Sequence, residues 1–136
     1  RRRNPHKPMD YSKYTILIVD DVPLNIVLVK KLLERFAFNY RSANNGKAAL
    51  QSICEQRPDI VLLDIMMPVM DGYEALKAIR NDPEMKDLRV VFLSALNSEV
   101  EVLKGLEAGA NDFITKPILV ERLVSCIENQ ISEIEG

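Results

Sequence analysis

The chain has 136 residues, a net charge of −2 at neutral pH, and 47% apolar against 28% charged residues. This composition is typical of one globular domain and excludes a disordered chain. No apolar run approaches the roughly 20 residues that a membrane-spanning helix needs, and no apolar stretch follows the basic start as it would in a secretory signal. Cys54 and Cys126 lie far apart, so we expect packing residues in a cytoplasmic protein.

The basic residues at the start of the chain are concentrated in residues 1–8 (RRRNPHKP), which carry four positive side chains and no acid. Removing these four charges from a net −2 leaves −6 for the remainder. Four charges on a proline-containing segment are more typical of a linker than of a nucleic-acid or membrane contact. We therefore interpret residues 1–14 as an N-terminal basic tail or linker and residues 15–134 as the domain.

The first half of the chain alternates strand and helix. Residues 15–20 (TILIVD) are apolar and β-branched, as in a strand buried on both faces of a parallel sheet. Pro23 suits the first turn of a helix that continues to about Phe36. A more polar edge strand over 38–43 and a helix over 47–56 follow. We expect the buried face of the first helix to carry Leu24, Val27, Leu28, Lys31 and Leu32.

The middle of the chain continues the alternation. Residues 59–64 (DIVLLD) predict the most completely buried strand. The segment 65–72 (IMMPVMDG) contains proline, aspartate and glycine and predicts a loop before a helix over 72–81. A fourth strand over 88–93 ends at Ser94.

The last third of the chain predicts two more helices around one more strand. Ser98 is expected to cap a helix with Glu101 as its capping-box partner, and Gly109 ends that helix. Residues 112–115 (DFIT) form the fifth strand, and a final helix covers about 118–134. We expect one face of the final helix to carry Leu119, Leu123, Ile127 and Ile131.

Alternating strands and helices predict an α/β fold in three layers, with a doubly wound parallel sheet of five strands and five helices. In such sheets the ligand lies beyond the carboxyl ends of the strands. The chemically reactive side chains of this sequence fall at those ends: Asp20, Asp21, Asp64, Ser94 and Lys116.

This group of residues has the chemistry of a metal-assisted phosphoryl acceptor. Carboxylates suit a hard cation such as Mg²⁺, and an aspartate such as Asp64 can carry a phosphoryl group as an acyl phosphate. Each residue alone has a simpler interpretation: an acid can cap a helix, Ser94 can be a turn hydroxyl, and Lys116 can be solvated. Only the combination favours the site.

The chain resembles the receiver domain of two-component response regulators. The resemblance rests on ILIVDD (16–21), DIVLLDIMMPVMDG (59–72), VVFLSA (90–95) and GANDFITKP (109–117), and it extends from Thr15 to about Glu133. It implies a flavodoxin-like strand order, 2-1-3-4-5. It also implies a cytoplasmic signalling module that catalyses only its own phosphorylation and dephosphorylation.

The resemblance implies a role for each site residue. Asp64 would accept a phosphoryl group from a phosphohistidine on a sensor histidine kinase or histidine phosphotransfer protein. Mg²⁺, or Mn²⁺ in its place, would be held by Asp20, Asp21, Asp64 and the backbone carbonyl of Met66. Lys116 would contact the phosphoryl group, and the Lys116–Pro117 bond would be cis.

Ser94 and Phe113 would form a switch that changes the surface of the fourth helix, fifth strand and fifth helix. That surface would control a downstream protein or a fused output domain, with homodimerisation on phosphorylation as a further outcome and no direct nucleic-acid or membrane contact. Phe113 stands where tyrosine is often found in similar domains and lacks its hydroxyl. Met66 and Leu96 are apolar where some relatives place side chains that orient water, which predicts a long-lived acyl phosphate.

Three other functions compete with this interpretation. A small-molecule aspartyl-phosphate phosphatase typically carries a DxD pattern, whereas Asp20 and Asp21 are adjacent and precede a distant acceptor. A flavin-binding electron carrier would need a loop of small hydroxyl or glycine residues, and DDVPLN (20–25) instead offers acids that repel phosphate. A receiver-like interaction domain without phosphorylation would leave some matching positions unfilled, and here all are filled.

Overall fold

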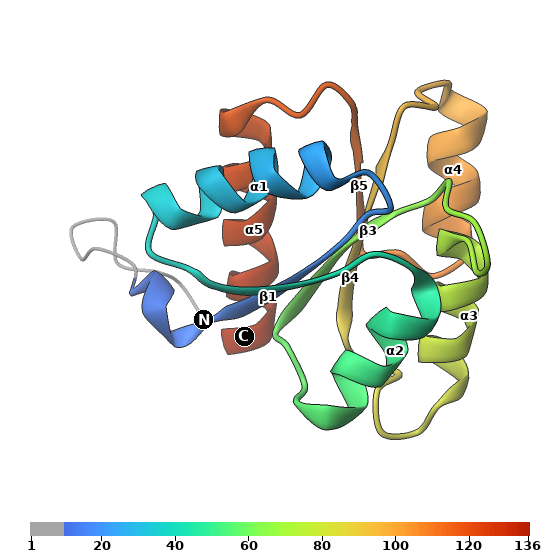
Figure 1. The fold of residues 1–136 in the computed structure, drawn as a ribbon, viewed down its shortest axis with the longest axis horizontal. Coiled ribbons are helices and arrows are strands. Elements are labelled where there is room, and N and C mark those ends of the chain that lie inside the picture. Colours follow the sequence, from blue (N-terminus) through green and yellow to red (C-terminus); the bar gives the residue numbers. More distant parts are fainter. Residues whose placement is uncertain (1–9) are drawn as a thin grey trace.

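The computed structural model of the protein describes residues 10–136, so the basic residues 1–9 lie outside the described part of the chain. Five parallel strands form one sheet with helices on both faces (Figure 1). The elements in chain order are the 3-10 helix η1 (Tyr11–Lys13), β1 (Thr15–Val19), α1 (Pro23–Arg35), β2 (Asn39–Ala43), α2 (Gly46–Glu55), β3 (Ile60–Asp64), α3 (Gly72–Asn81), β4 (Arg89–Ser94), α4 (Glu99–Glu107), β5 (Asp112–Thr115) and α5 (Val120–Glu135).

The strand order is β2-β1-β3-β4-β5, which confirms the order expected from the resemblance. The register aligns the carboxyl ends of the strands, since Val19 pairs with Leu63 and Asp64 pairs with Leu93. β3 is buried along its whole length, whereas β2 at the edge carries more exposed residues, as the composition of both segments predicts.

The core has two layers, one on each face of the sheet. Alternate residues of β1 point to opposite faces, so Leu17 joins the layer under α2 and α3, and Ile18 joins the layer under α1 and α5 (Figure 1). Both side chains are fully buried. Burial of one such side chain stabilises the fold by roughly 1.5–3 kcal/mol, so the sheet is held rigidly between its helices.

The predicted buried face of α1 was wrong. Leu24 and Leu28 are 64% and 55% exposed, while Val29 and Leu33 are buried in the layer that also contains Ile18. The helix carries two overlapping apolar stripes at spacings of three and four, and the sequence pattern does not distinguish them. The stripe with Val29 and Leu33 is the buried one, because it packs against apolar side chains of the sheet such as Ile18.

The final helix begins two residues later than predicted, at Val120, with the exposed Leu119 as its N-cap residue. The remainder of the expected face is correct, because Leu123, Ile127 and Ile131 are buried. The two cysteines differ in environment: Cys126 is buried, as expected of a packing residue, but Cys54 is exposed.

The capping box predicted for α4 forms only in part. The Ser98 hydroxyl accepts a hydrogen bond from the Glu101 backbone N–H at 3.2 Å, which confirms Ser98 as the cap. The complete reciprocal box is found at α3, where Asp71 and Glu74 each accept a hydrogen bond from the other's backbone N–H. The sequence analysis did not identify that box, which fixes the start of the helix after β3.

Residues 10–14 pack on the domain, which corrects their predicted place in the N-terminal tail. The Tyr11 ring lies 4.5 Å from the Phe38 ring, and Tyr14 is buried. The Tyr11 hydroxyl donates a hydrogen bond to Glu128 of α5 at 2.5 Å. Among residues 10–136, no helix is both long and apolar enough to span a bilayer.

Candidate functional site

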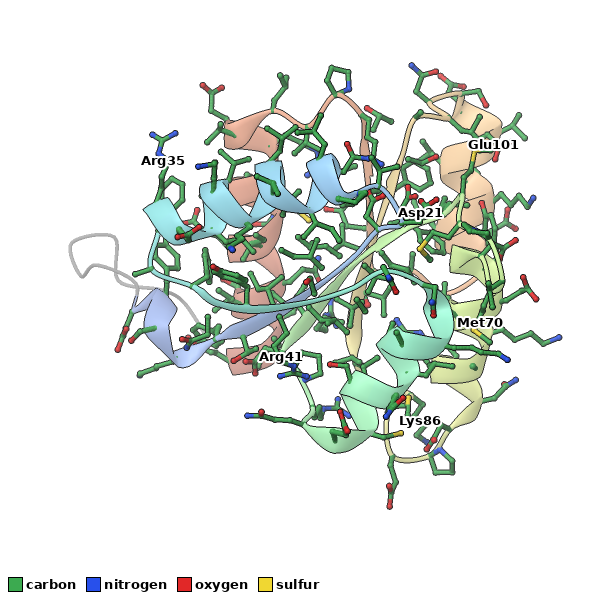
Figure 2. The ribbon with its side chains drawn as sticks, in the orientation of Figure 1. Asp21, Arg35, Arg41, Met70, Lys86 and Glu101 are labelled. Atoms are coloured by element: carbon green, nitrogen blue, oxygen red, sulfur yellow. The ribbon has the colours of Figure 1, made fainter. Side chains whose placement is uncertain are left out.

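Asp20, Asp21 and Asp64 meet at the carboxyl edge of the sheet. One carboxylate oxygen of each lies within 4.8 Å of the others. Asp20 and Asp64 are buried and Asp21 is half-buried, and Figure 2 shows Asp21 at this edge, with Lys86 at the opposite end of the molecule. The β1–β3 pairing causes this meeting, because two adjacent parallel strands end at the same level.

Lys116, directly after β5, reaches the same point. Its ammonium lies 3.1 Å from Asp20 Oδ2 and 3.2 Å from Asp64 Oδ1, and donates a hydrogen bond to each. Burial lowers the pKa of Lys116, but the hydrogen bond to Asp20 and the charge of Asp64 outweigh it, so that its pKa lies above the ordinary value. Lys116 is therefore a fixed positive charge in the acidic site.

Asp64 has the most perturbed environment of the three acids. Burial, followed by repulsion from Asp20, raises the pKa of Asp64 to about 6, although the charge of Lys116 lowers it. The carboxylate is therefore ionised at neutral pH but at a cost. A carboxylate of this kind is a better nucleophile than an ordinary one and gains from any further positive charge.

The residues of the site fit a divalent metal ion. Three carboxylates opposed by one lysine leave two negative charges uncompensated within a small, largely buried volume. Oxygen ligands with this excess charge are the donor set that Mg²⁺ prefers. Met66, the other expected ligand through its carbonyl, lies in the loop after β3, and its side chain is 63% exposed.

The alternative role of Asp20 and Asp21 as helix caps is not supported. The N-cap residue of α1 is Val22, which has no side-chain capping bond. Asp20 Oδ1 accepts a hydrogen bond from the backbone N–H of Val22 at 2.9 Å, and its Oδ2 faces Lys116. The hydrogen bond from Val22 thus orients the Asp20 carboxylate so that its Oδ2 points toward Lys116.

Ser94 and Phe113 lie behind the acidic group, on β4 and β5. The buried Ser94 Oγ accepts a hydrogen bond from the backbone N–H of Leu96 at 3.0 Å, so it acts as a turn hydroxyl and retains its own O–H donor. Phe113 is buried and points inward, packed at 6.3 Å from the Phe92 ring. The Lys116–Pro117 peptide bond is cis.

The site combines acids after β1 and at the end of β3 with a lysine after β5. This arrangement agrees with the site of one known protein family. The family model of the response regulator receiver domain matches residues 16–128. The chain belongs to the response regulator receiver domain family. Receiver domains are the signalling domains of two-component systems, which excludes the flavin-carrier interpretation and disfavours the phosphatase.

The relatives of this receiver domain include proteins of about its own length and proteins several times longer. The chemotaxis protein CheY of Bacillus subtilis is 35% identical over 88% of this chain and 98% of its own length. The response regulator PleD of Caulobacter vibrioides is 40% identical over 76% of this chain, but only 23% of its own length is covered. The chain thus spans about a quarter of the length of PleD.

Solved receiver domains share the fold. The signal receiver domain of a signal transduction histidine kinase from Syntrophus aciditrophicus is 33% identical, with a TM-score of 0.82 over 89% of this chain and 92% of that one. The Francisella response regulator 1452 receiver domain is 29% identical, with a TM-score of 0.83 over 89% of this chain and 98% of that one.

Gly72 is a site residue of this receiver domain that the sequence analysis placed in a loop without assigning it a role. A Cβ atom there would lie 2.6 Å from the Asp64 carbonyl oxygen and 2.7 Å from Ile65 Cα. Only glycine allows α3 to start directly against the backbone of the acceptor strand. The Asp71-Gly72 pair that ends the loop was the available signal, but its close contact with β3 is a tertiary feature.

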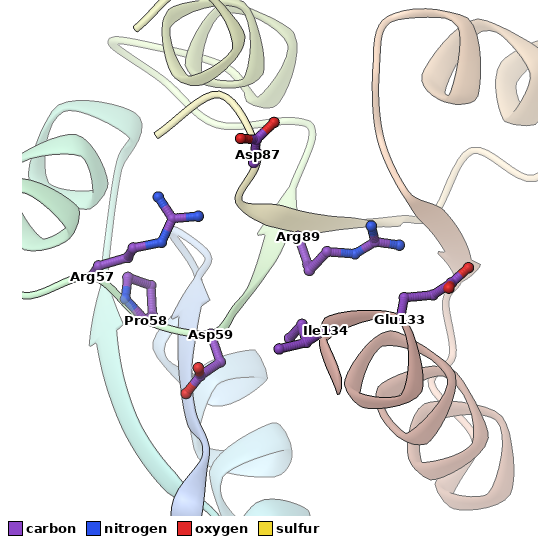
Figure 3. Close-up of a pocket in the computed structure, with 7 residues that line it drawn as sticks. All are labelled: Arg57, Pro58, Asp59, Asp87, Arg89, Glu133 and Ile134. Carbon is purple, nitrogen blue, oxygen red and sulfur yellow. The ribbon is translucent and has the colours of Figure 1, made fainter. Parts of the chain in front are cut away.

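A charged hollow at the amino ends of the strands contrasts with the acidic site. It has a volume of about 310 Å³ and lies between the α2–β3 turn, the start of β4 and the end of α5 (Figure 3). Its walls combine Arg57 and Arg89 with Asp59, Asp87 and Glu133. The mixed charges do not converge on one point in Figure 3, so the hollow lacks the concentrated charge of the acidic site.

Proposed function

We propose that this receiver domain accepts a phosphoryl group on Asp64 from a phosphohistidine, with Mg²⁺ bound, and thereby relays a two-component signal. The observation that carries the proposal is the convergence of Asp20, Asp21 and Asp64 around the Lys116 ammonium. One group is nucleophilic, two others can hold a metal, and the lysine supplies a fixed positive charge.

In the proposed transfer, a carboxylate oxygen of Asp64 forms the new P–O bond while the P–N bond of the phosphohistidine breaks. The electron pair of that bond returns to the imidazole nitrogen of the donor. Asp20, Asp21, Asp64 and the Met66 carbonyl would hold Mg²⁺, or Mn²⁺ in its place, which would supply positive charge to offset the phosphoryl oxygens. Lys116, which donates a hydrogen bond to Asp64 Oδ1 before the transfer, contacts the phosphoryl group after it.

The proposed readout begins at Ser94 and Phe113. Ser94 keeps a free O–H donor, which can turn to a phosphoryl oxygen on Asp64. Phe113 lies on β5 against Gly105 of α4, and β5 pairs with the strand that carries Ser94. In the proposed readout, a shift of Ser94 toward the phosphoryl group changes the space that Phe113 fills. The surface of α4, β5 and α5 then changes its affinity for a downstream protein or a fused output domain.

The proposed partners follow from this chemistry. The donor is a sensor histidine kinase or a histidine phosphotransfer protein in the cytoplasm, and phosphorylation can promote a homodimer. Output domains differ among the relatives, which include a probable cyclic di-GMP phosphodiesterase of Vibrio cholerae and the DNA-binding response regulator MtrA of Mycolicibacterium smegmatis. Direct binding of nucleic acid or membrane is not proposed for this domain, which covers residues 15–134 and modifies only itself.

Incubation with acetyl phosphate and Mg²⁺ tests the proposal. We expect intact-protein mass spectrometry to show the addition of one phosphoryl group, which is lost in Asp64→Ala. Asp59→Asn is the matched control, since Asp59 directly precedes the same strand and accepts a hydrogen bond from Thr15 N–H. Unchanged mass gain in Asp64→Ala, or sustained release of phosphate from small esters, contradicts the proposal.

A further inference from the structure

α4 is held against the domain by very little buried surface. Its only buried residue is Gly105, whereas α5 buries Leu123, Cys126, Ile127, Gln130 and Ile131. A Cβ atom at Gly105 would lie 2.7 Å from Phe113 Cδ2 and 3.1 Å from Phe92 Cδ2. α4 thus lies directly on two aromatic rings through a residue without a side chain, and few contacts oppose its displacement.

Tyr73, on the first turn of α3, lies beside the same rings. Its ring meets the Phe92 ring at 5.2 Å edge to face, and the Lys104 ammonium of α4 lies 4.7 Å from the centre of the Tyr73 ring. The Tyr73 hydroxyl is buried and has no hydrogen-bond partner among the described residues. A buried hydroxyl without a partner destabilises the arrangement in which it occurs.

The three rings connect the acidic site with α4. Phe92 is fully buried on β4, and a Cβ atom at Gly72 would lie 3.2 Å from Phe92 Cε1 and 2.6 Å from the Asp64 carbonyl oxygen. On its other side, Phe92 contacts Phe113. A change around Asp64 can therefore reach α4 through packed aromatic rings, without a hydroxyl at Phe113.

We propose that Tyr73 is a second polar residue of the switch, in addition to Ser94, and that its hydroxyl donates a hydrogen bond to the Glu101 carboxylate when α4 is displaced by phosphorylation of Asp64. This inference rests on the proposed function and explains how phosphorylation of Asp64 would stabilise a displaced position of α4. Phe113 has no hydroxyl, so the change in polar contacts has to come from another residue of the aromatic cluster, and Tyr73 is the one with an unused donor.

Glu101 is the acceptor that α4 offers. It lies in the first turn of α4, with only its backbone N–H used by Ser98, and no hydrogen bond or ion pair occupies its carboxylate within residues 10–136. Glu101 precedes Lys104 by three residues in α4, so both side chains leave the helix on the same side, and Lys104 lies over the Tyr73 ring. Burial raises the pKa of Tyr73, and the negative charges of Glu101 and Asp71 act in the same direction. Asp71 is already the N-cap of α3 and moves together with Tyr73.

Three variants test the inference: Tyr73→Phe, Glu101→Ala and the two combined. Tyr40→Phe is the matched control, because Tyr40 is also half-buried under a lysine, with Lys30 at 5.6 Å from its ring centre. Hydrogen–deuterium exchange of residues 99–107 is measured with and without acetyl phosphate and Mg²⁺. Intact mass reports in the same samples how much Asp64 is phosphorylated.

We expect equal phosphorylation in all variants, with the phosphorylation-dependent change in α4 exchange about tenfold smaller in Tyr73→Phe and in Glu101→Ala. The double variant should lose no more than either single one, since both remove one bond. Without phosphate, Tyr73→Phe should raise the Tm by about 3 °C, because it removes the unpartnered hydroxyl.

A wild-type exchange response in Tyr73→Phe at equal phosphorylation overturns the inference while the proposed function stands. Additive losses in the double variant, or a lower Tm for Tyr73→Phe, overturn it too. Absence of any mass gain in the wild type contradicts the proposed function, and the inference with it. Tyr73→Phe keeps the ring and its packing, so the variant is expected to fold.

Discussion

Charged side chains at the two ends of the sheet differ in how completely their charges are compensated. At the amino end, Asp59 accepts a hydrogen bond from Thr15 N–H at 2.8 Å, and Arg89 donates one to Gln130 at 2.8 Å. Arg80 donates to three backbone carbonyl oxygens, of Gly109, Lys86 and Leu88, and to the Asn111 side chain. At the carboxyl end, three carboxylates face one lysine.

This difference separates charges that hold the fold from charges that perform chemistry. A buried charge with its hydrogen bonds satisfied stabilises its surroundings and has little reactivity. A buried charge with too little counter-charge, such as that of Asp64, raises the free energy of its surroundings, and a cation or covalent modification relieves this cost. The predictions below test this contrast between the two ends.

The largest expected effect is on metal binding. Asp20→Asn combined with Asp21→Asn should weaken Mg²⁺ binding at least about 100-fold, because it removes two of the three carboxylate ligands. Isothermal titration calorimetry with MgCl₂ measures the affinity. Asp59→Asn with Asp87→Asn changes the net charge equally at the amino end and should bind Mg²⁺ as the wild type does. An equal loss in both pairs would mean that only net charge matters.

The second prediction concerns the amino end. Arg80→Ala should lower the free energy of unfolding by about 2–3 kcal/mol, because three carbonyl oxygens in the α3–β4 and α4–β5 loops lose a charged donor. Urea unfolding measures the change, and phosphorylation of Asp64 should be unaffected in the folded protein. Loss of phosphorylation without loss of stability would contradict the separation of the two ends.

A third prediction concerns the lifetime of the phosphorylated state. Met66 and Leu96 are 63% and 40% exposed at the rim of the site, and neither side chain can position an attacking water. Met66→Asn with Leu96→Glu should accelerate loss of the phosphoryl group about tenfold, measured by the decay of the added mass. Met66→Leu with Leu96→Met is the apolar control. Equal rates in all three proteins would show that these positions do not limit hydrolysis.

The smallest expected effect is on stability and depends on pH. Because the pKa of Asp64 is raised to about 6 from a model-peptide value of 3.8, the folded state binds more protons than the unfolded state between these values. Stability is therefore lost as pH rises from about 4 through 6. Without Mg²⁺, Asp64→Asn should be more stable than the wild type at pH 7.5, by on the order of 1 kcal/mol after allowance for solvent screening.

Urea unfolding in EDTA at pH 7.5 and pH 5 measures this difference, which should be smaller at pH 5. Saturating Mg²⁺ should reduce it as well, because the cation replaces the missing counter-charge. A wild type more stable than Asp64→Asn at pH 7.5 in EDTA would show that Lys116 alone compensates the acidic site.

The sequence predicted the strands well, and Asp20, Asp21, Asp64 and Lys116 lie together at one edge of the sheet, as expected. The apolar runs before Asp20 and Asp64 are short and β-branched, and such runs have few alternatives to a buried strand. The residues that follow them must then lie at one edge, because all strands of the sheet are parallel. The strand order came from resemblance, since periodicity does not determine which strands are neighbours.

The buried faces of the helices and the close contacts of the glycines were harder to predict from the sequence. α1 carries two apolar stripes, and the sequence analysis chose the exposed one with Leu24 and Leu28. Gly72 ends a predicted loop and Gly105 lies within a predicted helix, and the sequence indicates no special role for either. Each is needed where another element comes too close for a side chain. Such needs arise from packing between segments distant in the sequence.

The sequence by itself determined the alternation of elements and the residues that end each strand, because both depend on local patterns of polarity. Only the tertiary structure decided how far Lys116 compensates Asp64, since that depends on distances across the sheet and on burial. It also decided that the Tyr73 hydroxyl lacks a partner beneath α4. Local pattern specifies which groups are present, whereas packing specifies which of them remain unsatisfied.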